Sequence, residues 1–260
     1  MNKNYKTILA VVAIFSISLI GLFFLFRNEQ SSFIKKYDSK TKETTTLQYI
    51  LKDGDTIFHG KFICYNEKGH KTSEGNFVNG HLQGKCIYYF DSGIIESIYY
   101  YKNSEIIEQN IDNFPSGKIM RYTLYDDLGM SAFIIRFDEK GNVENYKGYP
   151  IMEVYQDKTK TKERFKIKIN KNPKTGDTLQ HQYLIADIPN AKRNFKIENI
   201  GVDDAKAKRT FKKTSRRDID VEEILTKKGI NTIRAVVKYE FNDNKKTVIN
   251  DTVSFKVEVH

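Results

Sequence analysis

The chain has 260 residues, enough for two modest domains or one large one, because single hydrophobic cores usually stop growing at roughly 250 residues. Hydrophobic residues make up 39% of the sequence and charged residues 29%, with 16 Tyr, 17 Phe and four Pro, which excludes a disordered or collagen-like chain. The formal net charge is +10, and nearly all of it comes from residues 151–260. We therefore expect two folded domains that differ in composition.

An apolar segment at residues 8–26 is predicted to cross a membrane. It runs for 19 residues without a charge, and a helix of that length rises about 28 Å, close to the ~30 Å hydrocarbon core of a bilayer. A cleaved secretory signal is the alternative, but its apolar region is usually about 7 to 15 residues long and ends in a small-x-small site. Here Phe23 to Phe26 fill that place. We expect an uncleaved signal anchor.

The flanking charges favour one orientation of this anchor. Lys3 and Lys6 precede it, which favours a cytoplasmic N-terminus at residues 1–7, although the lysines between Lys35 and Lys42 weaken the asymmetry. We expect a single-pass protein of the inner membrane, with its body periplasmic or extracellular. Residues 27–57 are expected to form a linker and a first strand.

A period of 24 residues runs through residues 58–150. Each unit holds two short runs rich in aromatic and β-branched residues, bounded by Gly, Asn and Asp. This pattern predicts a repeated β-hairpin, with Gly where a turn needs positive φ, and hence an elongated antiparallel sheet. The recurring positions are Gly69, Gly93, Gly117 and Gly141; Ile63, Ile87, Ile111 and Ile135; and Phe77, Tyr101, Tyr125 and Tyr149.

The run from Gly80 to Lys85 has the appearance of a phosphate-binding loop but not its spacing. Such a loop has four residues between its glycines, then Lys-Ser/Thr at the start of a helix. Here three residues separate Gly80 from Gly84, Cys86 follows the lysine, and a strand is predicted next. These glycines are therefore interpreted as turn residues.

The repeat resembles a known family. The pattern Gly60-x-Phe62-x-x-Tyr65-x-x-x-Gly69, then Glu74-x-x-Phe77-x-Asn79-Gly80-x-x-x-Gly84, is similar to the bacterial variant of the MORN repeat, the YwqK-type antitoxin family. Later units depart from it, with Ser104, Glu108 and Leu128 where the motif has glycines. The resemblance implies a non-catalytic hairpin array involved in protein scaffolding and membrane association, and the family label implies neutralisation of a partner toxin.

The two cysteines, Cys64 and Cys86, are predicted to be free thiols. Equivalent strands of successive hairpins lie two strands apart, or about 9.5 Å. The Cα atoms of a disulfide are rarely more than about 7 Å apart.

Residues 151–260 lack the period and are predicted to form a β-sandwich. They hold 25 Lys and Arg against 16 Asp and Glu, and their short strand-like runs alternate with turn residues. The ending from Gly229 to Val259 resembles the last two strands of an immunoglobulin-like envelope domain. Asp218 to Lys227 is expected to be a short helix or a crossover.

One segment of this domain is basic and contains no acidic residue. It has three interpretations: a solvated loop or strand, a contact with an anionic polymer or lipid headgroup, and a nucleic-acid site. The last is disfavoured, because a single aromatic residue, Phe211, gives little surface for base stacking. The candidate anionic-surface contacts are Lys206, Lys208, Arg209, Lys212, Lys213, Arg216 and Arg217.

No motif of a known catalytic, cofactor or metal site occurs in the sequence. The five histidines lack partners at metal-ligand spacing, and no nucleophile elbow, zinc-protease helix, Cys-x-x-Cys pair or EF-hand loop is present. We expect no catalytic residues, cofactor or metal. The leading hypothesis is a membrane-anchored, non-enzymatic envelope protein that binds a protein or ligand through its repeats. The alternatives are an antitoxin-like module and an enzyme acting on carbohydrate or peptidoglycan.

Overall fold

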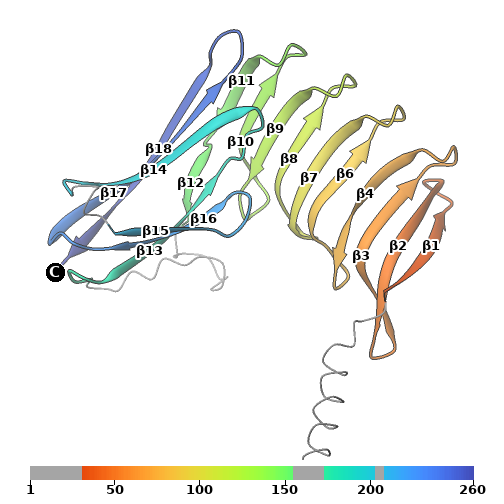
Figure 1. Cartoon of the computed structure of the whole chain (residues 1–260), viewed down its shortest axis with the longest axis horizontal. Coiled ribbons are helices and arrows are strands. Elements are labelled where there is room, and N and C mark those ends of the chain that lie inside the picture. Colours follow the sequence, from red (N-terminus) through yellow and green to blue (C-terminus); the bar gives the residue numbers. More distant parts are fainter. Residues whose placement is uncertain (1–30, 155–172, 203–207) are drawn as a thin grey trace, which may run out of the picture.

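The computed structural model describes residues 31–154, 173–202 and 208–260. In these ranges the secondary structure consists of antiparallel β-strands arranged in three sheets (Figure 1). The predicted mainly β class is confirmed. No helix in these ranges is long and apolar enough to span a bilayer, and the expected anchor at residues 8–26 lies outside them.

The first sheet is an 11-stranded meander that we call the repeat sheet (Figure 1). It begins at Ser32, so two complete strands precede Phe58, where the sequence predicted a linker and one strand. The second of these strands turns back at Asp53 and Gly54, both at positive φ, as a two-residue hairpin turn requires. The strands are β1 Ser32–Asp38, β2 Glu43–Lys52, β3 Asp55–Tyr65, β4 Lys71–Val78, β5 His81–Leu82, β6 Gly84–Tyr89, β7 Ile95–Asn103, β8 Ile106–Asn113, β9 Ile119–Tyr125, β10 Ser131–Phe137 and β11 Val143–Gly148.

The 24-residue period corresponds to one turn type, which recurs at the same end of successive strand pairs. Gly69, Gly93, Gly117 and Gly141 have φ between 78° and 88°, and each N–H donates to the carbonyl three residues earlier at 2.8–2.9 Å. The strand register shifts just before each turn, between residues 64/65, 88/89, 112/113 and 136/137. This is a turn closed by a glycine bulge, a conformation that strains an L-residue. The glycine column is therefore required by the backbone.

The aliphatic column lies on one face of the sheet, which we call the aliphatic face. Ile87, Ile98 and Ile111 are successive cross-strand partners, and the row continues to Tyr122 and Ile135. The opposite face, called the tyrosine face, carries Tyr88, Tyr99 and Tyr101, whose rings pack at centroid distances of 5.6 and 6.2 Å. Alternation along the strands thus divides the tyrosine-rich runs between two faces.

Packing on the tyrosine face explains a glycine outside the turns. Gly75 lies on β4, and a Cβ atom there would be 2.6 Å from both Cys86 Sγ and Phe62 Cε1. Cys86 is buried in this contact, and both it and Cys64 are free thiols, as predicted. Gly75 is therefore required by the close approach of side chains rather than by its own φ.

We predict that Gly75→Ala lowers the free energy of unfolding by about 1–3 kcal/mol, because the added methyl overpacks the contact with Cys86 and Phe62. Urea denaturation of the full chain in detergent measures this. Cys86→Ala removes one of the two clashing atoms and should reduce the cost. Gly93→Ala, which meets no atom within 4 Å but has φ +82°, should cost about 1–2 kcal/mol whatever residue 86 is. Equal stability of Gly75→Ala and wild type would contradict the packing argument.

The other two sheets face each other as a β-sandwich. Asp218–Ile224, expected to lie in a helix or crossover, is instead a strand paired on both sides. This pairing overrides the helical preference of its Glu-rich sequence, because Val221 and Glu223 must alternate into the interior. The four-stranded sheet has the order β12 Ile151–Val154, β13 Thr178–Ile185, β16 Asp218–Ile224 and β15 Arg209–Lys213; the three-stranded sheet has the order β14 Ala191–Ile200, β17 Gly229–Phe241 and β18 Val248–Val259.

The end of the repeat sheet and the sandwich share one hydrophobic core. Tyr122 and Leu124 of β9 and Phe133 of β10 are fully buried together with side chains of the sandwich. The Tyr122 hydroxyl donates to Gln109 Oε1 at 2.9 Å and accepts from the Asp187 N–H at 2.8 Å. Pro150 therefore marks a change of sequence composition but not the edge of a separate core.

His181 is a titratable group buried in the sandwich. Its Nδ1 lies 2.8 Å from the Tyr183 hydroxyl, and its ring packs edge-on against Phe255. Burial lowers the pKa of His181 from 6.5 to about 4, with a smaller contribution from the charge of Arg209. The folded protein therefore holds this histidine neutral where the unfolded chain takes up a proton.

We predict that the stability contributed by neutral His181 is present above pH 6.5 and is lost as the pH falls toward 4. The loss should be on the order of 3 kcal/mol, because each unit of pKa shift corresponds to about 1.4 kcal/mol. Urea denaturation at pH 7 and pH 4.5 should show a smaller difference for His181→Phe than for wild type. Identical pH dependence of the two proteins would contradict the assignment.

Candidate functional site

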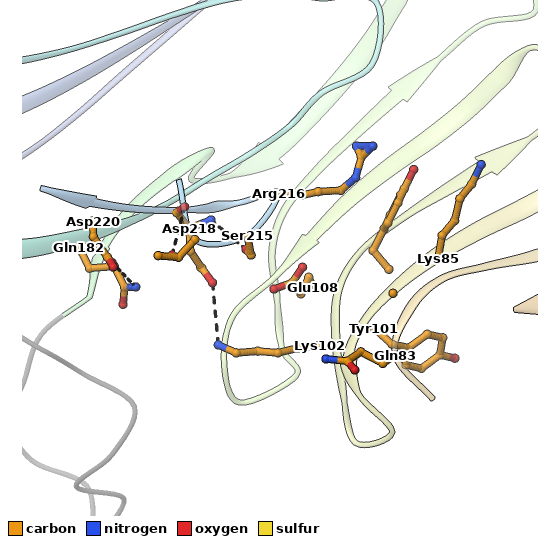
Figure 2. Close-up of a pocket in the computed structure, with 13 residues that line it drawn as sticks. Gln83, Lys85, Tyr101, Lys102, Glu108, Gln182, Ser215, Arg216, Asp218 and Asp220 are labelled. Carbon is orange, nitrogen blue, oxygen red and sulfur yellow. Dashed lines mark hydrogen bonds and ion pairs between the residues drawn. The ribbon is translucent and has the colours of Figure 1, made fainter. Parts of the chain in front are cut away.

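A cleft of about 730 Å³ opens where the repeat sheet meets the sandwich (Figure 2). Its volume lies within the range of roughly 300–1,000 Å³ that is typical of ligand sites. Strands β6–β8 supply one wall, and β13, β16 and the turn before β16 supply the other. The lining residues are Gln83, Gly84, Lys85, Tyr100, Tyr101, Lys102, Glu108, Gln182, Thr214, Ser215, Arg216, Asp218 and Asp220.

The wall from the repeat sheet is shaped by cross-strand pairing and a bulge. Lys85 and Tyr100 are direct partners on β6 and β7, so their side chains share the aliphatic face. The register between β7 and β8 shifts after Tyr100, which leaves Glu108 without a partner directly across from it. Bulges of this kind re-aim side chains at sheet edges and sites. Glu108 lies 24 residues after Gly84, at the position where earlier units have glycine.

A buried group of charges joins the two walls, and we call it the Arg217 cluster: Arg217, Lys102, Glu108, Asp127 and Asp218. The Arg217 guanidinium has no solvent exposure and lies 2.5 Å from Asp127, 3.6 Å from Asp218 and 3.8 Å from Glu108. Lys102 Nζ lies 3.7 Å from Asp127 and 3.9 Å from Asp218. Because Glu108 and Asp127 belong to the repeat sheet and Arg217 to the sandwich, the cluster holds the two together.

The Arg217 cluster contains three carboxyl groups and two cations. Burial raises the pKa of Glu108, and the opposing charge of Arg217 does not cancel this effect. Burial likewise raises the pKa of Asp218, again against the opposing charge of Arg217. The cluster thus has more carboxyl groups than cations and is poorly solvated. This favours the uptake of a proton or the binding of another cation.

We predict that removing a cation from this cluster lowers the stability of the fold much more than removing a carboxylate charge. Arg217→Met should lower the free energy of unfolding by about 3–5 kcal/mol, because it leaves buried carboxylates without their main partner. Glu108→Gln should change it by less than about 1 kcal/mol at pH 7, because the remaining carboxylates match the two cations. Urea denaturation measures both. Equal losses for the two variants would contradict this charge balance.

The same variant tests the raised pKa of Glu108. Because folding binds a proton at this carboxyl, its contribution to stability falls as the pH rises from the ordinary value of 4.5 toward the higher folded-state pKa. Glu108→Gln should remove that part of the pH dependence.

The structure separates the seven predicted anionic-surface contacts into three groups. Lys206 lies outside the described residues. Arg209 and Arg217 are not surface residues, because Arg209 bonds Glu223 at 2.6 Å with 8% of its side chain exposed and Arg217 is fully buried. The surface prediction is wrong for these two. Lys208, Lys212, Lys213 and Arg216 are exposed.

The exposed lysines do not form an isolated positive strip. Strand β15 pairs with β16, and this register places Arg209 opposite Glu223, Thr210 opposite Glu222 and Lys212 opposite Asp220. The basic segment in the sequence is therefore matched by an acidic strand beside it in space. The signal was present in the sequence as a basic run followed directly by an acidic one, the pattern of a charged hairpin.

Among the predicted contacts that the structure describes, Arg216 alone lines the cleft. Its guanidinium carbon lies 4.4 Å from the centre of the Tyr100 ring, and Nη1 donates to Asp187 Oδ2 at 3.0 Å. Sequence reasoning missed the carboxylates that face it from the opposite end, Asp218 and Asp220, because they lie in the segment expected to be helical. The sequence did carry a signal for Glu108, because it is a charged residue at a repeat position where earlier units have glycine.

Across residues 31–154, 173–202 and 208–260, no group of three or more His, Cys, Asp or Glu side chains is arranged to hold a metal ion. Comparison with protein-family models and with curated proteins finds no match for this chain. The resemblance of residues 58–150 to the bacterial MORN variant stays a prediction from the residues that carry it.

Proposed function

We propose that the protein is a membrane-anchored, non-enzymatic binding protein of the cell envelope, which holds its ligand in the cleft between the repeat sheet and the sandwich. The repeat sheet is, in this proposal, a MORN-like hairpin array and the sandwich an immunoglobulin-like domain. The cleft carries the proposal, because side chains from both parts of the fold converge in it and ligand sites occur preferentially at such junctions.

The cleft is supported by interactions that fix its walls before a ligand arrives. Arg217 and its carboxylates cross the junction, and the Tyr122 hydroxyl accepts a hydrogen bond from the sandwich backbone at Asp187. A wall that is already ordered loses little conformational entropy on binding. The shared core and the Arg217 cluster together therefore favour a preformed binding site over one assembled by the ligand.

The anchor gives the repeat sheet a role as a spacer. Only five residues separate Phe26 from Ser32, which span at most about 20 Å, so β1 lies close to the membrane surface when residues 8–26 span it. The cleft begins at β6 and β7, and β7 is five strand spacings, or about 24 Å, further along the sheet. The sheet thus holds the cleft at a fixed distance from the bilayer.

We predict that a photo-crosslinking amino acid at Tyr100, whose side chain faces Arg216 in the cleft, captures a cell-envelope component in intact cells. The same amino acid at Tyr146, which is 51% exposed on β11 and outside the cleft, serves as the matched control. The tagged protein should be in the membrane fraction, should leave it when residues 8–26 are deleted, and should lose a C-terminal tag to protease in spheroplasts.

Each part of the proposal can fail separately. Equal capture at residues 100 and 146 would argue against the cleft as the site. A tag that is protected until lysis would place the body in the cytosol and would favour the antitoxin-like alternative, in which a partner protein is neutralised.

A further inference from the structure

Most charged side chains of the cleft are sorted by sign along its length. Figure 2 shows Lys85 toward one end, with Arg216 reaching toward it, and Asp218 and Asp220 at the other end, with Glu108 between and Lys102 beside Asp218. Three basic and three acidic residues line the cleft, so it has little net charge but a marked polarity. A site of this kind complements a ligand that carries both signs of charge at separate places.

The basic end has a fixed cation and an unpaired one. Arg216 is held over the Tyr100 ring by its hydrogen bond to Asp187, which orients the guanidinium before a ligand binds. In the part of the chain that the structure describes, no carboxylate lies within 4.0 Å of Lys85 Nζ. Lys85 is therefore free to bind a carboxylate at the exposed end of the cleft.

The acidic end has a buried carboxylate with one oxygen that accepts no hydrogen bond within the described part of the chain. Asp218 is 4% exposed, and its Oδ1 accepts no hydrogen bond from the described residues. The closest cations are Arg217 Nε, 3.6 Å from Oδ1, and Lys102 Nζ, 3.9 Å from Oδ2. Asp220 is oriented toward the same end by Gln182, which donates to it at 2.7 Å. An ammonium group here would supply the missing donor and offset the cluster's excess negative charge.

The lining also holds uncharged polar groups besides its charged ends and Glu108. It offers the amides of Gln83 and Gln182 and the hydroxyls of Thr214, Ser215 and Tyr100, which can donate to and accept from peptide groups. We infer that the cleft binds a short peptide with a free ammonium at the Asp218 and Asp220 end and a free carboxylate at the Lys85 and Arg216 end. This inference rests on the proposed binding function.

The charge arrangement distinguishes this ligand from the anionic partners suggested by composition. A polyanion that contacted Lys85 and Arg216 would extend toward Asp218 and Asp220 and be repelled there. A polycation would be repelled by Lys85 and Arg216 at the basic end. A ligand with one charge of each sign satisfies both ends.

The inference is tested by isothermal titration of the full chain in detergent with three probes: trialanine, N-acetyl-trialanine and trialanine amide. Trialanine should bind, and blocking either end should weaken binding by about tenfold or more, as expected for the loss of one charge-assisted contact. Lys85→Gln should abolish the difference between trialanine and its amide. Asp220→Asn should abolish the difference between trialanine and its acetylated form. Lys147→Gln, an exposed change on β11 outside the cleft, should leave all three affinities unchanged.

The outcomes separate this inference from the proposed function. Equal affinity for the three probes, or no binding of any probe while residue 100 still captures an envelope component, would overturn the peptide assignment and leave the binding function standing. Absence of both probe binding and capture would overturn both. Sensitivity to both blocked ends, with the two variants acting on opposite ends, would support the assignment.

Discussion

The burial of Arg217 is the constraint on which the arrangement of this molecule depends. A guanidinium without contact to water is tolerated only where carboxylates surround it, and these come from two parts of the fold: Glu108 and Asp127 from the repeat sheet, Asp218 from the sandwich. Together with the shared hydrophobic core, the pairing of this charge fixes how the repeat sheet lies against the sandwich. The cleft exists because that arrangement leaves β6–β8 facing the turn before β16.

Burial is distributed unevenly along the repeat sheet. All residues of β1 are exposed, whereas most of β8 is buried and β9 and β10 enter the core of the sandwich. A single-layered sheet buries only what its own side chains can cover, so the strands far from the sandwich depend on cross-strand pairs such as Phe62 with Phe77. The hydrophobic stabilisation of the sheet is thus concentrated at the end that also forms the cleft.

The sequence predicted the features that local backbone chemistry determines and missed those that depend on distant partners. The glycine column and the aliphatic column were readable because a bulged turn and a buried face each require one residue type at a fixed spacing. Only one of the two strands before Phe58 was predicted, because both lie before the region of shared columns. Arg217 could not be placed, because its partner Asp127 is 90 residues away in the chain and only the register of two sheets brings them together. Glu108, a charge in a glycine column, was a visible departure whose meaning only the structure supplies.

The simple order of the meander has a mechanical consequence. Each strand of the repeat sheet is hydrogen-bonded almost entirely to its neighbours in sequence, so the sheet behaves as a nearly one-dimensional array. A load on the N-terminal end acts first on the ladder between β1 and β2 and separates one strand at a time, while the sandwich and the Arg217 cluster carry little of it until the last hairpins are reached. The molecule is thus compliant where the chain enters the sheet and stiff around the cleft, so tension on the N-terminal end would lengthen the sheet while the cleft keeps its shape.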